Sequence, residues 1–215
     1  AVGRFDEDEI LDLVVPENES NAIHFYKGNG DGTFAAPRLI PCGHDPVDVR
    51  AGDMNNDGKL DVAISLAPEG GGTVEILLGN GDGTFLYDSS KSRTVHGPTY
   101  GLVVGDFFED QALDIVATAL GGAPGCESNE CGTLAFLKGN NDGSLARTVD
   151  FPTGNTPYGI DAGDIDKDGH LDVVIADSAD DTISVHLGDG MGNFTRAQTV
   201  PVGVTPATIT VVDID

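Results

Sequence analysis

The sequence predicts an all-β fold assembled from four similar units of four short antiparallel strands each. Three observations predict it. An Asp-rich loop followed by an apolar run occurs four times along the 215 residues. The 30 glycines and 11 prolines follow no G-X-Y period, which is typical of many turns joining short strands. No segment of the sequence shows helical periodicity.

The repeat is visible at two landmarks. The Asp-rich loops read GRFDEDEILDLVV, GDMNNDGKLDVAI, GDFFEDQALDIVA and GDIDKDGHLDVVI, beginning at Gly3, Gly52, Gly105 and Gly163. The turn GNGDGTF and its counterparts follow in each unit, at Gly28, Gly79, Gly139 and Gly188. Equivalent positions are 49 to 58 residues apart, a length that suits four short strands.

Each unit contains the four strands in the same order. The first strand runs into the Asp-rich loop, and the second leaves it as a nearly continuous apolar run, such as LDVAIS from Leu60, which is typical of strands buried on both faces. The third strand alternates in places, as in Val74, Ile76 and Leu78. The fourth follows the glycine-rich turn and opens with Phe34, Phe85, Leu145 or Phe194.

Units of this length joined by short turns are typical of β-propeller blades. A β-solenoid is the competing architecture, but its coils are usually much shorter. The predicted boundaries place one domain over 1–215, with blades at 1–45, 46–97, 98–156 and 157–205 and the start of a fifth at 206–215. Because the chain starts and ends within a first strand, we expect part of a seven-bladed ring, within a range of six to eight blades. A four-bladed ring, or a ring made of several copies, stays open.

The charge of the chain restricts its partners. Eleven basic against 36 acidic residues give a formal net charge of −25, which disfavours binding to nucleic acid. No apolar run is long enough to predict membrane insertion. Many of the carboxylates lie in the repeated loops, although part of the charge is explained equally well by a solvated acidic surface.

Two of the four loops carry a full set of oxygen donors. Positions 1, 3, 5 and 9 hold acids or an amide, position 7 offers a main-chain carbonyl, and position 6 is a glycine that allows a sharp turn. The predicted ligands are Asp53, Asn55, Asp57, Lys59 and Asp61 in the second unit, and Asp164, Asp166, Asp168, His170 and Asp172 in the fourth. A hard cation such as Ca²⁺ takes six to eight oxygens, and the carboxylates would repel one another without it. An Asx-rich turn without an ion is the alternative.

The loops are not EF-hands, and two of them are incomplete. Position 12 is Ile64 or Ile175 instead of the bidentate glutamate that an EF-hand requires. In the first unit Arg4 and Glu9 replace the position-1 acid and the glycine. In the third, Phe108 and Gln111 replace two more key residues, so a weak third site is possible at Asp106, Asp110 and Asp114.

Two of the three cysteines are close enough in sequence to form a local disulfide in an oxidising compartment. Cys126 and Cys131 lie in the polar segment GCESNECG, where a local disulfide is favoured over a share in a metal site. Cys42 has no evident partner.

These repeated loops resemble the FG-GAP and VCBS repeat family, which includes the propellers of integrin α-subunits and of many secreted microbial proteins. The resemblance covers essentially the whole chain. It implies an extracellular or cell-surface propeller with calcium in the loops between first and second strands, held by the ten residues named above. The departures at Arg4, Glu9, Phe108 and Gln111 weaken this implication for the other two loops.

Because such calcium would be structural, we expect the function at the opposite end of the blades. The predicted role is a binding or adhesion module for a glycan or an extracellular protein, with ligand contacts from Asp45, Tyr100, Asn155 and Tyr158. Packing of the two tyrosines inside the channel is an equal alternative. We expect no enzyme, because the five histidines form no zinc signature and no nucleophile motif is present. Part of a polysaccharide lyase, or a self-assembling structural subunit, are the other hypotheses.

Overall fold

The computed structural model describes residues 1–68, 71–121 and 131–213. These residues form four antiparallel sheets, one for each predicted unit, so the all-β blade architecture is confirmed. No helix in the described parts of the chain is long and apolar enough to span a membrane.

Each sheet follows the chain order from its first strand to its fourth. Blade 1 contains β1 (Val2–Gly3), β2 (Asp12–Glu17), β3 (Ala22–Tyr26) and β4 (Arg38–Pro41). Blade 2 contains β5 (Pro46–Gly52), β6 (Asp61–Leu66), β7 (Gly72–Gly79), β8 (Phe85–Tyr87) and β9 (Arg93–Val95). Blade 3 contains β10 (Thr99–Gly105), β11 (Asp114–Leu120), β12 (Cys131–Gly139) and β13 (Leu145–Asn155). Blade 4 contains β14 (Pro157–Gly163), β15 (Asp172–Asp177), β16 (Thr182–Gly188) and β17 (Phe194–Pro201).

The fourth strand of blade 2 is divided by the insertion that the sequence shows there. β8 and β9 both pair with β7, and the short 3-10 helix η1 (Ser89–Lys91) connects them. The side chain of Asp88 accepts a hydrogen bond from the amide of Ser90 and caps this helix. The insertion therefore lengthens the outer edge of the blade without changing its strand order. A second 3-10 helix, η2 (Ser178–Asp180), connects β15 and β16 in blade 4.

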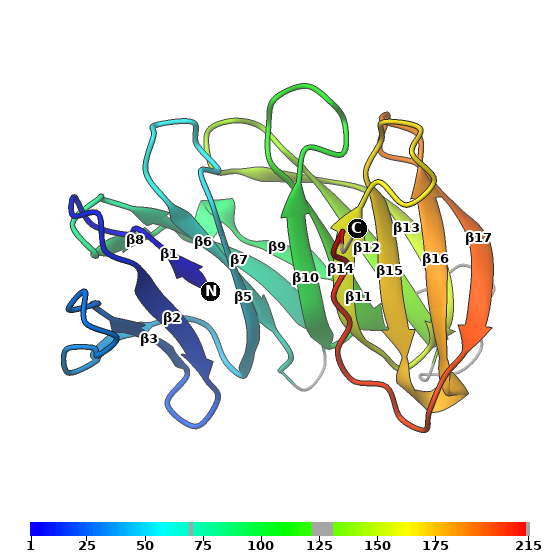
Figure 1. The fold of residues 1–215 in the computed structure, drawn as a ribbon, viewed down its shortest axis with the longest axis horizontal. Helices are drawn as coiled ribbons and strands as arrows, with labels where there is room; N and C mark the ends of the chain where they lie inside the picture. Colours follow the sequence, from blue (N-terminus) through cyan, green and yellow to red (C-terminus); the bar gives the residue numbers. More distant parts are fainter. Residues whose placement is uncertain (69–70, 122–130, 214–215) are drawn as a thin grey trace.

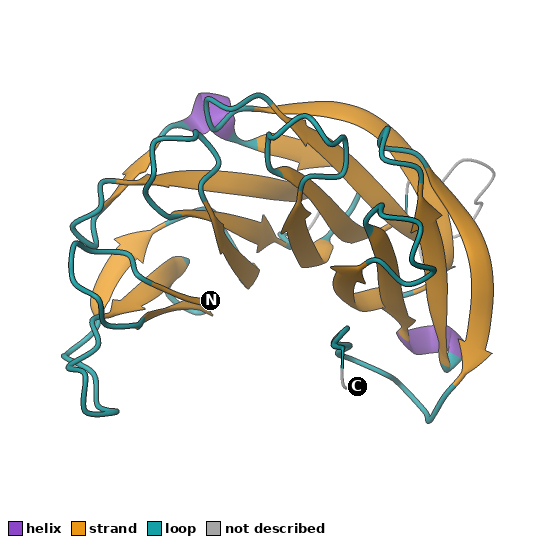
Figure 2. Cartoon of the chain, turned by 45° about the horizontal axis from the view of Figure 1, so that its top comes forward, coloured by secondary structure: helices purple, strands orange, loops and turns teal. Residues whose placement is uncertain are grey.

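The four blades follow one another around an open arc, with the two termini on either side of its opening (Figures 1 and 2). After β17 the chain returns to the inner side of β14, as the red segment of Figure 1 shows. There the amide of Val211 donates to Asp161 Oδ2 at 2.7 Å. This segment occupies the place beside β14 where the first strand of a further blade is predicted.

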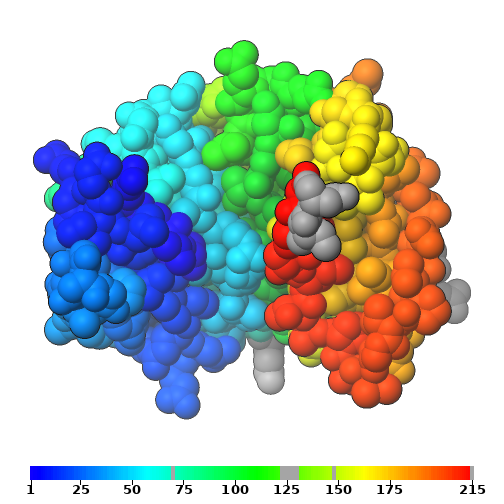
Figure 3. Space-filling view, in the orientation of Figure 1, coloured from blue at the N-terminus to red at the C-terminus, as the bar shows by residue number. Residues whose placement is uncertain are grey.

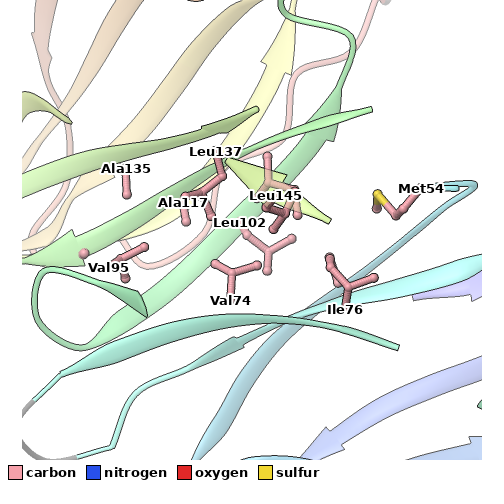
Figure 4. Close-up of a cluster of buried hydrophobic side chains, with 12 residues drawn as sticks. Met54, Val74, Ile76, Val95, Leu102, Ala117, Ala135, Leu137 and Leu145 are labelled. Carbon is pink, nitrogen blue, oxygen red and sulfur yellow. The ribbon is translucent and has the colours of Figure 1, made fainter. Parts of the chain in front are cut away.

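A hydrophobic cluster fills each of the three junctions between successive blades. In the junction between blades 2 and 3, Val74 and Ile76 of β7 lie opposite Leu102 of β10 (Figure 4). Strand β6 serves two clusters, because Ile64 packs toward blade 1 and Ala63 toward blade 3. All six residues of β6 are buried, which confirms the prediction of a second strand covered on both faces.

One buried histidine in the junction between blades 3 and 4 makes the fold sensitive to acid. Burial, and secondarily the charge of Arg196, lowers the pKa of His186 to about 4. Its side chain is 1% exposed, and Nε2 has no hydrogen-bond partner among the described residues. As the pH falls below about 6.5, His186 is protonated in the unfolded chain but stays neutral in the folded chain until about pH 4. The folded state is therefore destabilised relative to the unfolded state across that window.

We expect this effect to cost about 2 kcal/mol of unfolding free energy between pH 7 and pH 5. Asp177 faces the same junction, and burial raises its pKa, which changes stability in the opposite direction. The measurement is therefore a comparison of urea unfolding at pH 7 and pH 5 for the wild type and His186→Gln. An equal loss in both proteins would contradict the assignment.

Candidate functional site

The aspartate at position 9 of each Asp-rich loop has the same buried environment in all four blades. The four residues, Asp12, Asp61, Asp114 and Asp172, are 0% exposed. One carboxylate oxygen accepts the amide of the second loop residue at 2.7 to 3.2 Å, from Phe5, Met54, Phe107 and Ile165. The other accepts the amide of a glycine at the end of the third strand, or two residues after it in blade 1, at 2.7 to 2.9 Å, from Gly28, Gly79, Gly139 and Gly188. These aspartates therefore join each loop to the next hairpin, whether or not the loop has a full donor set.

Glycine is required at the second of these contacts because the two main chains approach closely. A Cβ at Gly79 would lie 2.1 Å from the carbonyl oxygen of Leu60, and one at Gly188 would lie 2.2 Å from that of Leu171. Burial also raises the pKa of Asp61 to about 6, although the two amides act against this shift. The sequence predicts Asp61 and Asp172 as metal ligands but does not predict this structural role. The recurrence of the residue in the two incomplete loops is the signal that points to it.

The loop of blade 4 could hold a metal ion. One carboxylate oxygen each of Asp164, Asp166 and Asp172 lies within 4.8 Å of the others. Calcium binds oxygen at about 2.3 to 2.6 Å, so ligands on opposite sides of one ion are about 5 Å apart, and the triad fits that size. The amide of Asp168 donates to Asp164 and Asp166 at 3.1 and 3.2 Å and folds the loop around this point.

His170 occupies the position predicted to contribute only a main-chain carbonyl. Its ring nitrogen Nδ1 is paired with Glu109 in the loop of blade 3, so the side chain is directed to the neighbouring blade. Its amide donates to Asp168 Oδ1 at 2.9 Å. The side chain thus takes no part in the triad, in keeping with the predicted role.

The loop of blade 2 has the same main-chain pattern. The amide of Asp57 donates to Asp53 Oδ1 at 3.0 Å and to Asn55 Oδ1 at 3.1 Å. Gly58 has a φ of 84°, and its amide donates to Asp53 Oδ2 at 2.8 Å. Here an amide side chain stands in the position of Asp166 in blade 4.

In the other two loops, carboxylates are paired with a lysine from elsewhere in the same blade. In blade 3, Lys138 Nζ lies 2.7 Å from Asp110 Oδ2, while Asp106 accepts the amides of Asp110 and Gln111. In blade 1, Lys27 is paired with both Asp6 and Asp8. The predicted weak site at Asp106, Asp110 and Asp114 is therefore shared with a lysine, a contact that the sequence does not predict.

A cavity of about 430 Å³ lies on the inner side of the arc, between first strands. Its wall includes Tyr100 of β10, Tyr158 of β14 and residues 207–209 of the returning segment. Figure 3 shows that segment in red beside the green and cyan surface of blades 3 and 2. The two tyrosine rings meet nearly edge to face, with centroids 4.7 Å apart. The tyrosines thus pack against each other in the channel and also line a cavity.

Both tyrosines are held from the preceding blade. Ser65 Oγ donates to the carbonyl of Tyr100 at 2.6 Å, and Thr118 Oγ1 donates to the carbonyl of Tyr158 at 3.0 Å. The side chain of Tyr158 stays accessible, at 36% exposure for the residue. Burial raises the pKa of Tyr100, which keeps its hydroxyl protonated as a hydrogen-bond donor.

The charged residues of the cavity form a neutral pair. Arg50 binds Asp48 through Nη1 and Nη2, both at 3.2 Å, and its Nε donates to the carbonyl of Leu102 at 3.0 Å. Asp48 in turn accepts the amide of Leu102 at 3.2 Å. This cavity therefore offers aromatic surface and polar groups without net charge, on a molecule whose formal charge is −25.

The other two predicted ligand residues lie outside the cavity lining and have structural contacts. Asn155 donates its main-chain amide and its side-chain Nδ2 to Asp180, each at 2.8 Å. Asp45 has a φ of 55° and donates its amide to Asn21. Cys131 is disulfide-bonded, whereas its predicted partner Cys126 lies outside the described residues. Cys42 is a free thiol.

Solved structures that are similar to this chain include the following two. BBS1N, solved in complex with ARL6DN and soaked with lead, has a TM-score of 0.63 and 15% identity, covering 96% of this chain and 57% of that chain. A functionally unknown protein from Desulfotomaculum acetoxidans has a TM-score of 0.48 and 14% identity, covering 93% and 68% of the two chains. This chain thus spans just over half the length of the BBS1N chain, and the likeness shows a shared propeller-like fold alone.

No curated protein matches this sequence. The profile of the FG-GAP-like repeat matches residues 4–64, 125–175 and 164–215, which together make up more than half of the chain. The matched regions contain the Asp-rich loops of blades 1, 2 and 4. The chain therefore belongs to the FG-GAP-like repeat family.

Proposed function

We propose that this protein is an extracellular, calcium-stabilised propeller that binds a glycan in the cavity of Tyr100 and Tyr158. The cavity carries the proposal, because it combines exposed aromatic surface with a few fixed polar groups, as small-ligand sites do. An uncharged ligand suits it best, since Arg50 and Asp48 neutralise each other. The alternative is that the same binding module recognises an extracellular protein.

Calcium would bind in the Asp-rich loops, at the ends of the first strands that lie away from the cavity. The loops of blades 2 and 4 would hold it through Asp53, Asn55, Asp57, the carbonyl of Lys59 and Asp61, and through Asp164, Asp166, Asp168, the carbonyl of His170 and Asp172. The ion would supply charge neutralisation to the clustered carboxylates. An ion that binds only the folded chain stabilises it by about 2.7 kcal/mol per site at a hundredfold excess over Kd. The disulfide at Cys131 favours an oxidising, extracellular location.

A glycan array, probed with the whole protein in calcium, tests the proposal. We expect binding to a defined neutral sugar and an affinity at least tenfold lower for Tyr158→Ala, because an aromatic face of the cavity is lost. Phe34→Ala is the matched control, since Phe34 is an exposed aromatic residue of blade 1, at 42%, outside the cavity. The absence of binding by a folded protein, or equal binding by Tyr158→Ala, would contradict a glycan site here.

A further inference from the structure

We infer that blades 1 and 3 are held by a lysine ammonium group in the place where blades 2 and 4 hold calcium. The propeller then alternates between ion-dependent and ion-independent blades. The contrast rests on the proposed calcium sites, but the lysine contacts themselves are independent of them.

In blade 1 the ammonium group binds the two acids of the middle of the loop. Lys27 Nζ is paired with Asp6 and lies 2.8 Å from Asp8 Oδ2. The two residues that depart from the calcium pattern pair with each other, since Arg4 Nη1 lies 3.3 Å from Glu9 Oε2. The positions that lost an acid and a glycine thus form a second ion pair instead of a ligand.

In blade 3 the ammonium group binds one acid of the loop and lies over an aromatic ring. Lys138 Nζ lies 2.7 Å from Asp110 Oδ2, the position-5 acid, and 4.0 Å from the ring centroid of Phe108. Phe108 stands where a calcium loop has its position-3 oxygen. A ring face attracts an ammonium group but is no ligand for calcium, so this loop is built for the lysine.

The two lysines occupy one and the same position of the repeat. Each precedes the glycine that is bonded to the position-9 aspartate, Gly28 in blade 1 and Gly139 in blade 3. That hydrogen bond holds the main chain next to the loop, so the lysine side chain begins close to the loop acids. The corresponding residues of the two calcium loops are Leu78 and Leu187, which bring no charge. The lysine is therefore present where the donor set is incomplete and absent where it is complete.

Electrostatics agrees with this arrangement. The paired carboxylates raise the pKa of Lys27, and Lys138 lowers the pKa of Asp110, so Lys27 and Asp110 stay charged. An ammonium group carries one charge where calcium carries two, and each lysine loop has lost at least one acid or oxygen ligand. Because the cation is tethered, chelation cannot remove it.

Hydrogen exchange of the whole protein, measured by peptide in calcium and after chelation, tests the inference. We expect chelation to raise exchange in 53–61 and 164–172 and to leave 4–12 and 106–114 unchanged. Lys138→Met should raise exchange in 106–114 at least fivefold in both conditions, and Lys27→Met should do the same in 4–12. Lys167→Met is the matched control, because Lys167 is exposed in the loop of blade 4 at a position that supplies no ligand.

Two further results distinguish the possible failures. Adding Asp110→Asn to Lys138→Met should return exchange toward the wild-type rate, because the unpaired carboxylate is gone. Unchanged exchange in 106–114 and 4–12 for the lysine variants would overturn the inference, as would loss of protection in all four loops on chelation. If chelation affects none of the loops, the calcium proposal fails, and the lysine variants still decide the role of the ammonium groups.

Discussion

Replacing Asp172 by alanine is expected to lower the free energy of unfolding by about 4 kcal/mol in calcium, one of the largest effects of any single change. The carboxylate is fully buried and accepts the amides of Ile165 and Gly188 at 2.7 and 2.9 Å. Leaving these two partly buried amides without partners costs about 1 kcal/mol each, the lower end of the range for buried groups. The variant also removes one member of the Asp164, Asp166 and Asp172 triad.

The part of this cost that belongs to calcium can be separated with Asp12→Ala. Asp12 makes the same two contacts, with Phe5 and Gly28, in a loop that lacks a full donor set. Urea unfolding in calcium and after chelation should show an extra loss of about 2 to 3 kcal/mol for Asp172→Ala in calcium only. Asp12→Ala should cost the same in both conditions. Calcium-independent costs for both variants would show that position 9 is structural alone.

Replacing Phe136 by alanine is expected to cost about 3 to 5 kcal/mol, the usual range for a fully buried phenylalanine. Its ring is 0% exposed in the junction between blades 3 and 4. The ring centroids of Phe107, Phe108 and Phe194 lie 6.1, 5.2 and 5.8 Å away. Truncation would leave a cavity among rings contributed by both blades and weaken the junction as a whole.

Thermal and urea unfolding of Phe136→Ala measure this cost. Phe34→Ala is again the control, because Phe34 is 42% exposed and its ring centroid lies 6.5 Å from Tyr26. We expect a loss below about 1 kcal/mol for the control. A loss for Phe136→Ala as small as that of the control would mean that the junction collapses around the missing ring.

Local chemistry was readable from the sequence. Each Asp-rich loop is contiguous, so the spacing of Asp164, Asp166 and Asp172 alone brings their oxygens around one point. The period of the repeat and the apolar run of β6 predicted the blades, because strand pairing here joins neighbours along the chain. The strand order also predicted that the four Asp-rich loops lie at the same end of the blades.

Contacts between distant segments were decided by the tertiary structure. Lys138 reaches Asp110 across the hairpin of its own blade, and His170 reaches Glu109 across a junction, 61 residues away. Tyr100 and Tyr158 were predicted ligand residues, but only the packing of successive blades places their rings in contact. Asn155 shared their predicted end of the blade and instead binds Asp180.

The sequence by itself determined the repeat, the four strands of each blade and the two complete donor sets. All three depend on hydrogen bonds and side-chain alternation within a few tens of residues. The tertiary structure alone decided the cavity and the tethered cations. These depend on how close one main chain or blade comes to the next, which is set by the buried rings and aliphatic side chains in each junction and by glycines such as Gly139.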